Sequence, residues 1–143
     1  MDITNTFKIG ASALKAHSLR LNTISSNLAN VETTSTPEGG PYKKQSVFFQ
    51  TKSLSFQDQL NNQINGSVKG VEVSKIIEDK TPPRKVYDPS HPDAAEDGYV
   101  EMPNISVLEE MVDMMSATRS YQANVTSIKM AKRMALKALE IGR

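Results

Sequence analysis

The sequence contains no cysteine, no tryptophan and only 2 histidines. Without cysteine the chain cannot form disulfides, thiolate nucleophiles or cysteine-ligated zinc sites. His17 and His91 have no second ligand at a suitable spacing, so the pattern indicates neither a metal site nor a catalytic dyad. No nucleophile elbow or dinucleotide-binding motif is present, and Pro41 follows the glycine pair Gly39-Gly40, where a phosphate loop needs free N–H groups. We therefore expect a protein that is not an enzyme and that binds no metal or cofactor.

Charge and long apolar runs are also scarce. The formal net charge is +1, which provides no field that would recruit nucleic acid or acidic lipid. No apolar run approaches the roughly 18–20 residues of a membrane span, and the N-terminus lacks the basic and apolar regions of a secretory signal. We expect no binding to nucleic acid and no direct membrane insertion. The chain is either soluble or exported without a cleaved signal peptide.

Hydrophobic residues make up 38% of the chain, below the roughly 45–50% of an average globular protein. Two long stretches nevertheless show a regular apolar pattern. In the first, apolar positions alternate in steps of four and three, which is a heptad repeat and predicts a long helix packed on another helix. Asn27 and Asn30 stand where this helix should end. The repeat comprises Ile3, Phe7, Gly10, Leu14, His17, Leu21, Ile24, Leu28 and Val31.

The second stretch follows Pro103 and should begin near Asn104, or at a capping box formed by Ser106 and Glu109. Acidic residues crowd its first turns and basic residues its last, as the helix dipole favours. Gly142 should end the helix. Its heptad repeat comprises Val107, Met111, Met114, Thr118, Tyr121, Val125, Ile128, Lys132, Ala135 and Leu139.

Residues 32–103 contain all 7 prolines, so helix should not dominate there. Turn signals separate four runs rich in β-branched or aromatic residues, at 45–49, 71–77, 84–87 and 98–102, which we predict to be short strands. Phe56, Leu60 and Ile64, spaced by four, predict one short helix.

These patterns predict a mainly α fold with a small β-rich insertion. Residues 1–31 and 104–143 form a terminal-helix domain in which the two long helices pair as a parallel or antiparallel coiled coil. Residues 32–103 form the inserted module of short strands and loops. A lean composition spread over long helices suggests an elongated body that buries its apolar stripe against neighbouring subunits. The expected assembly interface comprises Ile3, Phe7, Leu14, Leu21, Ile24, Leu28, Met111, Met114, Tyr121, Val125, Ile128 and Leu139.

Several short motifs resemble the bacterial flagellar rod and hook axial proteins. The N-terminal signature of that family is a helix ending in an Asn-x-Ala-Asn turn, which Asn27, Ala29 and Asn30 match. Further matches occur at 39–42, 87–94, 97–104, 109–124 and 139–142, and together they resemble a proximal rod protein. Residues 50–69 match nothing in the family pattern, and Val31-Glu32 departs from it. The remaining motif residues are Gly39, Gly40, Pro41, Tyr42, Asp88, Pro89, His91, Pro92, Asp93, Gly98, Tyr99 and Asn104.

This resemblance implies a structural subunit of the flagellar basal-body rod, which crosses the periplasm and transmits torque. It also implies export by the flagellar type III apparatus without a cleaved signal peptide. The implied partners are other rod proteins, copies of the chain itself and the hook–basal-body protein FliE. Two alternatives remain open: a sibling axial protein, such as another rod or hook subunit, and a cytoplasmic coiled-coil adaptor or secretion chaperone.

Overall fold

The computed structural model describes residues 3–51 and 69–141. Two long helices, α1 (Ile3–Ala29) and α3 (Val107–Ile141), enclose four strands in the sequence: β1 (Gln45–Thr51), β2 (Val71–Glu78), β3 (Arg84–Tyr87) and β4 (Tyr99–Met102). The expectation of a mainly α fold with a small β-rich insertion is confirmed. The short helix predicted around Phe56, Leu60 and Ile64 lies outside the described residues, as does Gly142.

Each helix boundary follows from local chemistry. The chain leaves α1 at Asn30, whose backbone N–H and side-chain amide both donate to the carbonyl of Ser26, at 3.1 and 2.8 Å. At the start of α3, the Ser106 hydroxyl accepts a hydrogen bond from the Glu109 N–H at 3.5 Å, the N-cap geometry of a capping box. Of the two predicted starts for this helix, the one at Ser106 is confirmed, because α3 begins at Val107.

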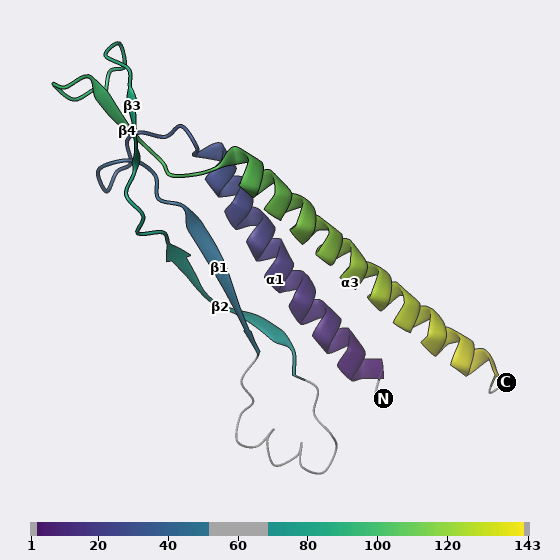
Figure 1. The fold of residues 1–143 in the computed structure, drawn as a ribbon. Helices are drawn as coiled ribbons and strands as arrows, with labels where there is room; N and C mark the ends of the chain where they lie inside the picture. The colour runs from purple at the N-terminus through teal and green to yellow at the C-terminus, as the bar shows by residue number, and fades with distance from the viewer. Residues whose placement is uncertain (1–2, 52–68, 142–143) are drawn as a thin grey trace, which may run out of the picture.

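The two helices lie side by side and run antiparallel, so both termini lie at the same end of the molecule (Figure 1). The end of α1 meets the start of α3, where Asn27 bonds to Glu110. Farther along, Gly10 lies so close to Ile128 that a Cβ on Gly10 would be 2.7 Å from Cγ1 of Ile128. The sequence did not predict whether the two helices are parallel or antiparallel, and in the structure they are antiparallel. The C-terminal end of α3 continues past the start of α1 (Figure 1).

The buried face of α3 differs in part from the predicted repeat. Within the single chain, Glu110, Ala117 and Ala131 are buried. Predicted positions one residue away are more exposed, including Met111 and Lys132. The other half of the repeat holds, because Met114, Tyr121, Ile128 and Ala135 are all partly buried. Two causes explain why the buried positions differ from the predicted ones. Close helix packing favours the small alanines, and a pattern of apolar residues cannot detect the buried carboxylate of Glu110.

Two antiparallel two-stranded ribbons complete the fold. The β1–β2 ribbon, with a bulge between Phe48 and Phe49, lies along α1, and α1 lies between this ribbon and α3 (Figure 1). The β3–β4 hairpin lies at the end of the molecule where α1 stops and α3 starts. No helix in the described part of the chain is both long and apolar enough to cross a membrane.

Candidate assembly site

A buried polar cluster joins the two helices to the strands. Its centre is Asn27, which is only 1% exposed. The Asn27 amide donates to the carbonyl of Gln45 at 2.9 Å and to Oε2 of Glu110 at 3.0 Å. Its Oδ1 accepts from the Gln45 N–H at 2.9 Å and from the Tyr42 hydroxyl at 3.1 Å. One side chain therefore connects α1, the start of β1, the loop before it and the first turn of α3.

An ion pair between the buried Glu110 and the partly exposed Lys44 completes this cluster. Glu110, also 1% exposed, accepts a 2.7 Å contact from Nζ of Lys44 through its second carboxylate oxygen. The hydrogen bond to Glu110 raises the pKa of Lys44 above its ordinary value of 10.5. A buried carboxylate requires such partners, because an unpaired charge in the interior is strongly destabilising. We call Asn27, Tyr42, Lys44, Gln45 and Glu110 the junction cluster.

The loop between α1 and β1 is folded by the remaining motif residues. Thr33 donates its hydroxyl to Asn30 at 3.1 Å and accepts the Tyr42 N–H on its carbonyl at 3.1 Å. Gly39 and Gly40 have φ values of 92° and 79°, in the left-handed region that favours glycine. Pro41 follows them and leads the chain toward Tyr42. These motif residues shape a turn that delivers Tyr42 to Asn27.

The motif residues from 88 to 99 build the tip of the β3–β4 hairpin. Asp88 accepts hydrogen bonds from the N–H and hydroxyl of Ser90, at 3.1 and 2.6 Å. Tyr87 packs edge-on against Tyr99 with ring centroids 5.3 Å apart, and a Cβ on Gly98 would lie 2.9 Å from the Tyr87 ring. Asp93 ties the tip to the α1–β1 loop by accepting a 2.7 Å bond from the hydroxyl of Thr34.

The other motif residues have simpler surroundings. His91 accepts the Asp93 N–H at Nδ1, and Asn104 donates to the Thr81 hydroxyl at 3.4 Å. Ala29, Pro89 and Pro92 are exposed. The motifs therefore serve local turns and the junction cluster, and among the described residues none of them gathers reactive groups.

The predicted interface residues of α1 are covered to different degrees. Ile24 is buried, and Phe7, Leu14, Leu21 and Leu28 are half-buried. The side chain of Ile3 lies outside the described part of the structure. Of the predicted α3 residues, Met114, Tyr121, Val125 and Ile128 are half-buried, whereas Met111 and Leu139 are exposed. The described part of the chain leaves these exposed members uncovered.

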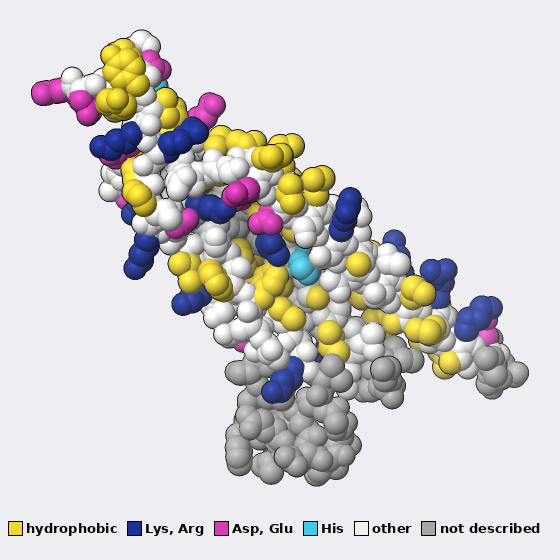
Figure 2. All heavy atoms as spheres, in the orientation of Figure 1, with side chains coloured by type: hydrophobic (Ala, Val, Ile, Leu, Met, Phe, Trp, Pro, Cys, Tyr) yellow, Lys and Arg dark blue, Asp and Glu magenta, His cyan; other side chains and the backbone are white. Residues whose placement is uncertain are grey.

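Sequence reasoning missed much of the exposed apolar surface of α3. Leu108, Met111, Val112 and Met115 follow the i, i+3, i+4, i+7 spacing of one helix face, and Leu108 is 73% exposed. We call these four residues the α3 stripe. At 3.6 residues per turn, it lies opposite the buried positions of Glu110 and Ala117. Apolar side chains are visible along this edge of the molecule (Figure 2). Their spacing is readable in the sequence, but the predicted heptad repeat describes only one face of the helix.

A second exposed apolar group lies near the C-terminal end of α3, where the helix continues past α1. It comprises Met130, Met134, Leu136 and Leu139. Basic residues including Arg133 and Lys137 flank this group. Glu140 also lines this group and pairs with Lys137 at 3.2 Å. The α3 stripe likewise has mixed charge near it, because Glu109 follows Leu108 and Arg119 lies four residues after Met115 on the same face.

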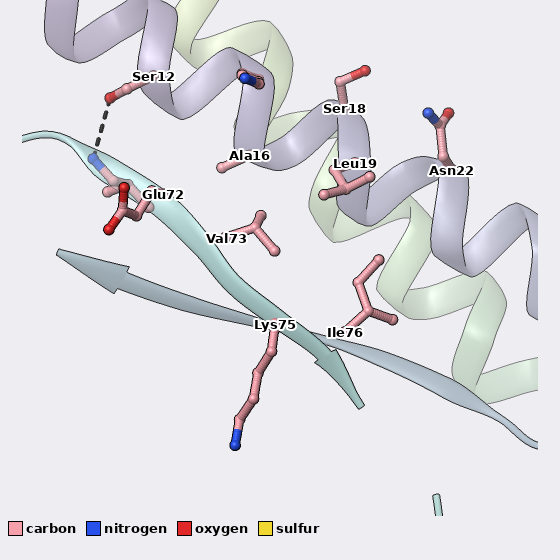
Figure 3. A pocket seen from close by; sticks show the side chains of 11 residues that line it. Ser12, Ala16, Ser18, Leu19, Asn22, Glu72, Val73, Lys75 and Ile76 are labelled. Atoms are coloured by element: carbon pink, nitrogen blue, oxygen red, sulfur yellow. Dashed lines mark hydrogen bonds between the residues drawn. The ribbon is translucent and has the colours of Figure 1, made fainter. Parts of the chain in front are cut away.

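A groove of about 720 Å³ separates α1 from β2. Ala16 and Leu19 point into it from the helix, and Val73 and Ile76 point into it from the strand (Figure 3). The Ser12 hydroxyl closes one end by accepting the Val71 N–H at 3.1 Å. Ala16 is 3% exposed and Ile76 is 44% exposed, so the groove has a covered floor and an open side.

His17 lies on α1 beside the ribbon and packs edge-on against Phe49, with ring centroids 5.5 Å apart. Its Nδ1 is buried and has no hydrogen-bond partner among the described residues. Burial, and secondarily the charge of Arg20, lowers the pKa of His17 below its ordinary value of 6.5. This environment favours the neutral form of the imidazole, which packs against the ribbon.

Comparison with known proteins places the molecule in context. Residues 7–35 match the family model described as flagella basal body rod protein, and residues 96–141 match that of the flagellar basal body rod FlgEFG protein C-terminal region. The chain is 47% identical to the flagellar basal-body rod protein FlgC of Bacillus subtilis, with all of both chains covered. It is 44% identical to FlgC of Salmonella typhimurium, also over all of both chains. Identity to FlgC of Borreliella burgdorferi is 41%, covering 99% of this chain and 98% of the relative.

Proposed function

The chain belongs to the family of the flagellar basal-body rod protein FlgC, and we propose that it is a structural subunit of the bacterial flagellar rod. It polymerises with other rod proteins into the drive shaft that transmits torque across the periplasm. The observation that carries this proposal is the 47% identity to a FlgC protein over the full length of both chains. Coverage of the complete chain also favours this function over a sibling axial protein, an adaptor or a chaperone.

The architecture supports a mechanical role. A shaft under torque requires stiffness, and the paired helices provide a long element with many packed side chains. We assign α1 and α3 to an antiparallel coiled coil. Two observations support this geometry. Glu110 and Ala117 are buried and lie seven residues apart, and Gly10 closely approaches Ile128.

The junction cluster gives the insertion a fixed position relative to the helices. Asn27 and Glu110 hold the start of β1 and the loop before it, so a force on residues 32–103 passes to both helices. We therefore divide the subunit into a terminal-helix domain (residues 1–31 and 104–143) and an inserted module (residues 32–103). The junction cluster connects them rigidly.

Assembly would bury the apolar surface that the single chain leaves exposed. Burial of apolar area contributes about 25 cal/mol per Å², so the large exposed side chains of α3 can contribute substantially to contacts between subunits. We assign the exposed Met111 and Leu139 to these contacts. We assign the half-buried Phe7, Leu14 and Val125 to the packing within and between helix pairs. Methionine suits such contacts, because its flexible thioether adapts to neighbours in different settings.

We further propose FliE, other rod proteins and additional copies of this chain as its neighbours. Delivery would use the flagellar type III export apparatus, without a cleaved signal peptide. Membership of the rod family supports these assignments.

A genetic experiment tests the proposed function. Deletion of the gene in the source bacterium should abolish swimming and leave basal bodies without complete rods, and the intact gene should restore both. Normal swimming in the deletion strain would contradict the proposal. A variant with Ile128→Asp places a carboxylate against Gly10 on the buried helix face and should fail to restore rods, whereas Gln122→Asp on the exposed face should restore them. Immunoblots should show equal expression of the two variants.

A further inference from the structure

The part of α3 that extends past α1 has a helix surface without a partner in the described part of the chain. From the contact between Gly10 and Ile128, α1 continues for seven residues to its start at Ile3, whereas α3 continues for thirteen residues to Ile141 (Figure 1). A shallow depression of about 450 Å³ lies on this segment, and at 3.6 residues per turn its member Arg133 lies opposite the buried Ala131. We call the six residues that line it the α3 end: Met130, Arg133, Met134, Leu136, Lys137 and Glu140.

The α3 end carries a positive excess. Between Asp113 and Glu140 the chain has no acidic residue and five basic ones, Arg119, Lys129, Lys132, Arg133 and Lys137. Glu140 pairs with Lys137, which leaves the exposed Lys129 and Arg133 without an ion pair among the described residues. None of the basic residues stands in the last turn of α3, and the effect of a helix dipole falls off within that turn. The dipole therefore does not account for this concentration of positive charge.

The opposite chemistry occurs at the tip of the β3–β4 hairpin, residues 87–99. Hydrogen bonds from neutral N–H and hydroxyl groups hold two of its carboxylates in the turn and leave their negative charge in place. Tyr87 and Tyr99 stand where the strands enter the tip and are 65% and 43% exposed. The nearest basic residues of the hairpin, Arg84 and Lys85, stand in the first half of β3, away from the tip. The tip has no Lys or Arg, and its four acidic residues are Asp88, Asp93, Glu96 and Asp97.

These two surfaces match in both charge and apolar chemistry. Exposed carboxylates of the tip complement the lysines and Arg133. An exposed tyrosine ring attracts a cation placed over its face and makes favourable contacts with a methionine thioether, and the α3 end offers both groups. The α3 stripe is a poorer match, because Glu109 and Arg119 give it mixed charge.

A single molecule cannot bring its own tip and its own α3 end together. The hairpin lies at one end of the elongated molecule and the C-terminal part of α3 at the other (Figure 1). Acidic side chains gather at the hairpin end, and basic and apolar side chains gather along α3 toward the C-terminus (Figure 2). We propose that the hairpin tip of one copy docks on the α3 end of a second copy, head to tail. The contact joins different surfaces of identical molecules, so it repeats from copy to copy and builds an open filament. This inference rests on the proposed function and adds the surfaces through which copies of the chain meet.

Cross-linking between cysteine variants tests this contact directly, because the chain has no cysteine of its own. One purified variant carries Ala95→Cys in the tip, and the other carries Met130→Cys in the α3 end and a heavy-isotope label. The two are mixed and treated with a short bismaleimide, and the mixed dimer is identified by its mass. The matched control replaces Met130→Cys with Met115→Cys, since both methionines lie on α3 and are 53% and 55% exposed. We expect the tip to give a several-fold higher yield of mixed dimer with Met130→Cys than with Met115→Cys.

Charge reversal supplies a second measurement on the same pair of variants. Adding Arg133→Glu to the α3-end copy should lower the yield several-fold, and adding Glu96→Lys to the tip copy should restore part of it. A general loss of folding would not produce this recovery. Arg119→Glu is the matched control, because Arg119 is also an exposed arginine of α3 and lies outside the α3 end. Its yield should stay close to that of the unreversed pair, and equal losses for the two arginine variants would contradict the assigned contact.

Sedimentation velocity of the unmodified chain tests the direction of the contact. Head-to-tail docking predicts species larger than a dimer whose share grows with concentration. Association that stops at a dimer would indicate two copies paired in opposite directions and would overturn the head-to-tail contact. A chain that stays monomeric at every concentration would overturn it together with self-polymerisation.

Two further outcomes would assign the α3 end differently. Polymers without a cross-link above the Met115→Cys control would overturn the tip contact and leave rod assembly intact. Binding of the chain to phosphatidylglycerol vesicles, again without that cross-link, would assign the α3 end to a lipid surface and would also overturn the contact. A deletion strain that still swims would instead refute the proposed function.

Discussion

Replacing Asn27 tests how strongly the junction cluster stabilises the molecule. Asn27→Leu keeps the branching of the side chain at Cγ and removes all four hydrogen bonds. A typical hydrogen bond contributes about 0.5–1.5 kcal/mol net, and one to a charged group about 1.5–3 kcal/mol. The variant also leaves the N–H and carbonyl of Gln45 without their side-chain partner. Relaxation of the loop recovers part of the loss, so we expect the free energy of unfolding to fall by about 3–4 kcal/mol.

Urea unfolding followed by circular dichroism measures this change. With a denaturant slope of about 2 kcal/mol/M, the midpoint should fall by about 1.5–2 M. Asn22→Leu is the matched control, because it makes the same substitution on the same helix at an exposed position. Its midpoint should shift by less than about 0.3 M, corresponding to a surface change within about 0.5 kcal/mol. Equal midpoints for Asn27→Leu and Asn22→Leu would refute the central role of the cluster.

Three further predictions concern titration and close packing. Because the pKa of Lys44 is raised in the folded state, its contribution to stability is present below pH 10.5 and is lost as the pH rises through the folded-state pKa. In Lys44→Met, the urea midpoint should no longer show this fall at alkaline pH. The lowered pKa of His17 has the opposite consequence, because below pH 6.5 the unfolded chain binds the proton more readily than the folded chain. The free energy of unfolding should therefore fall on acidification, and His17→Gln should reduce the difference in urea midpoint between pH 7.5 and pH 5. A change from glycine to alanine usually stabilises a helix by about 0.5–1 kcal/mol. Gly10→Ala should instead lower the melting temperature, because the new Cβ would collide with the side chain of Ile128. Adding Ile128→Ala to the same chain should remove this penalty.

The two long helices could be predicted from the sequence because a heptad pattern sustained over many turns is a strong local signal. Most of the strand ends are within a residue or two of the predicted ones, since prolines and other turn residues separate the strands. The relative direction of the helices had no such signal. It depends on the path of residues 32–103, which local patterns do not specify.

The junction cluster could not be predicted from periodicity. The sequence points to Asn27 as a helix-end residue and as part of a family motif, and it points to Glu110 as one of the acidic residues in the first turns of a helix. Glu110 is buried because Lys44 and Asn27, distant in the sequence, supply its partners. A pattern based on apolar residues therefore selected Met111 for the seam, one position from the residue that faces α1. Ala117 was passed over for the same reason, because its small size suits close packing and carries little apolar signal.

Electron cryomicroscopy of basal bodies isolated from the source bacterium would test membership of the rod most directly. We predict that density for this chain occurs in the wall of the rod, with α1 and α3 paired antiparallel and the β1–β2 ribbon beside α1. Rod density that is complete without this chain would contradict its assignment as a rod subunit.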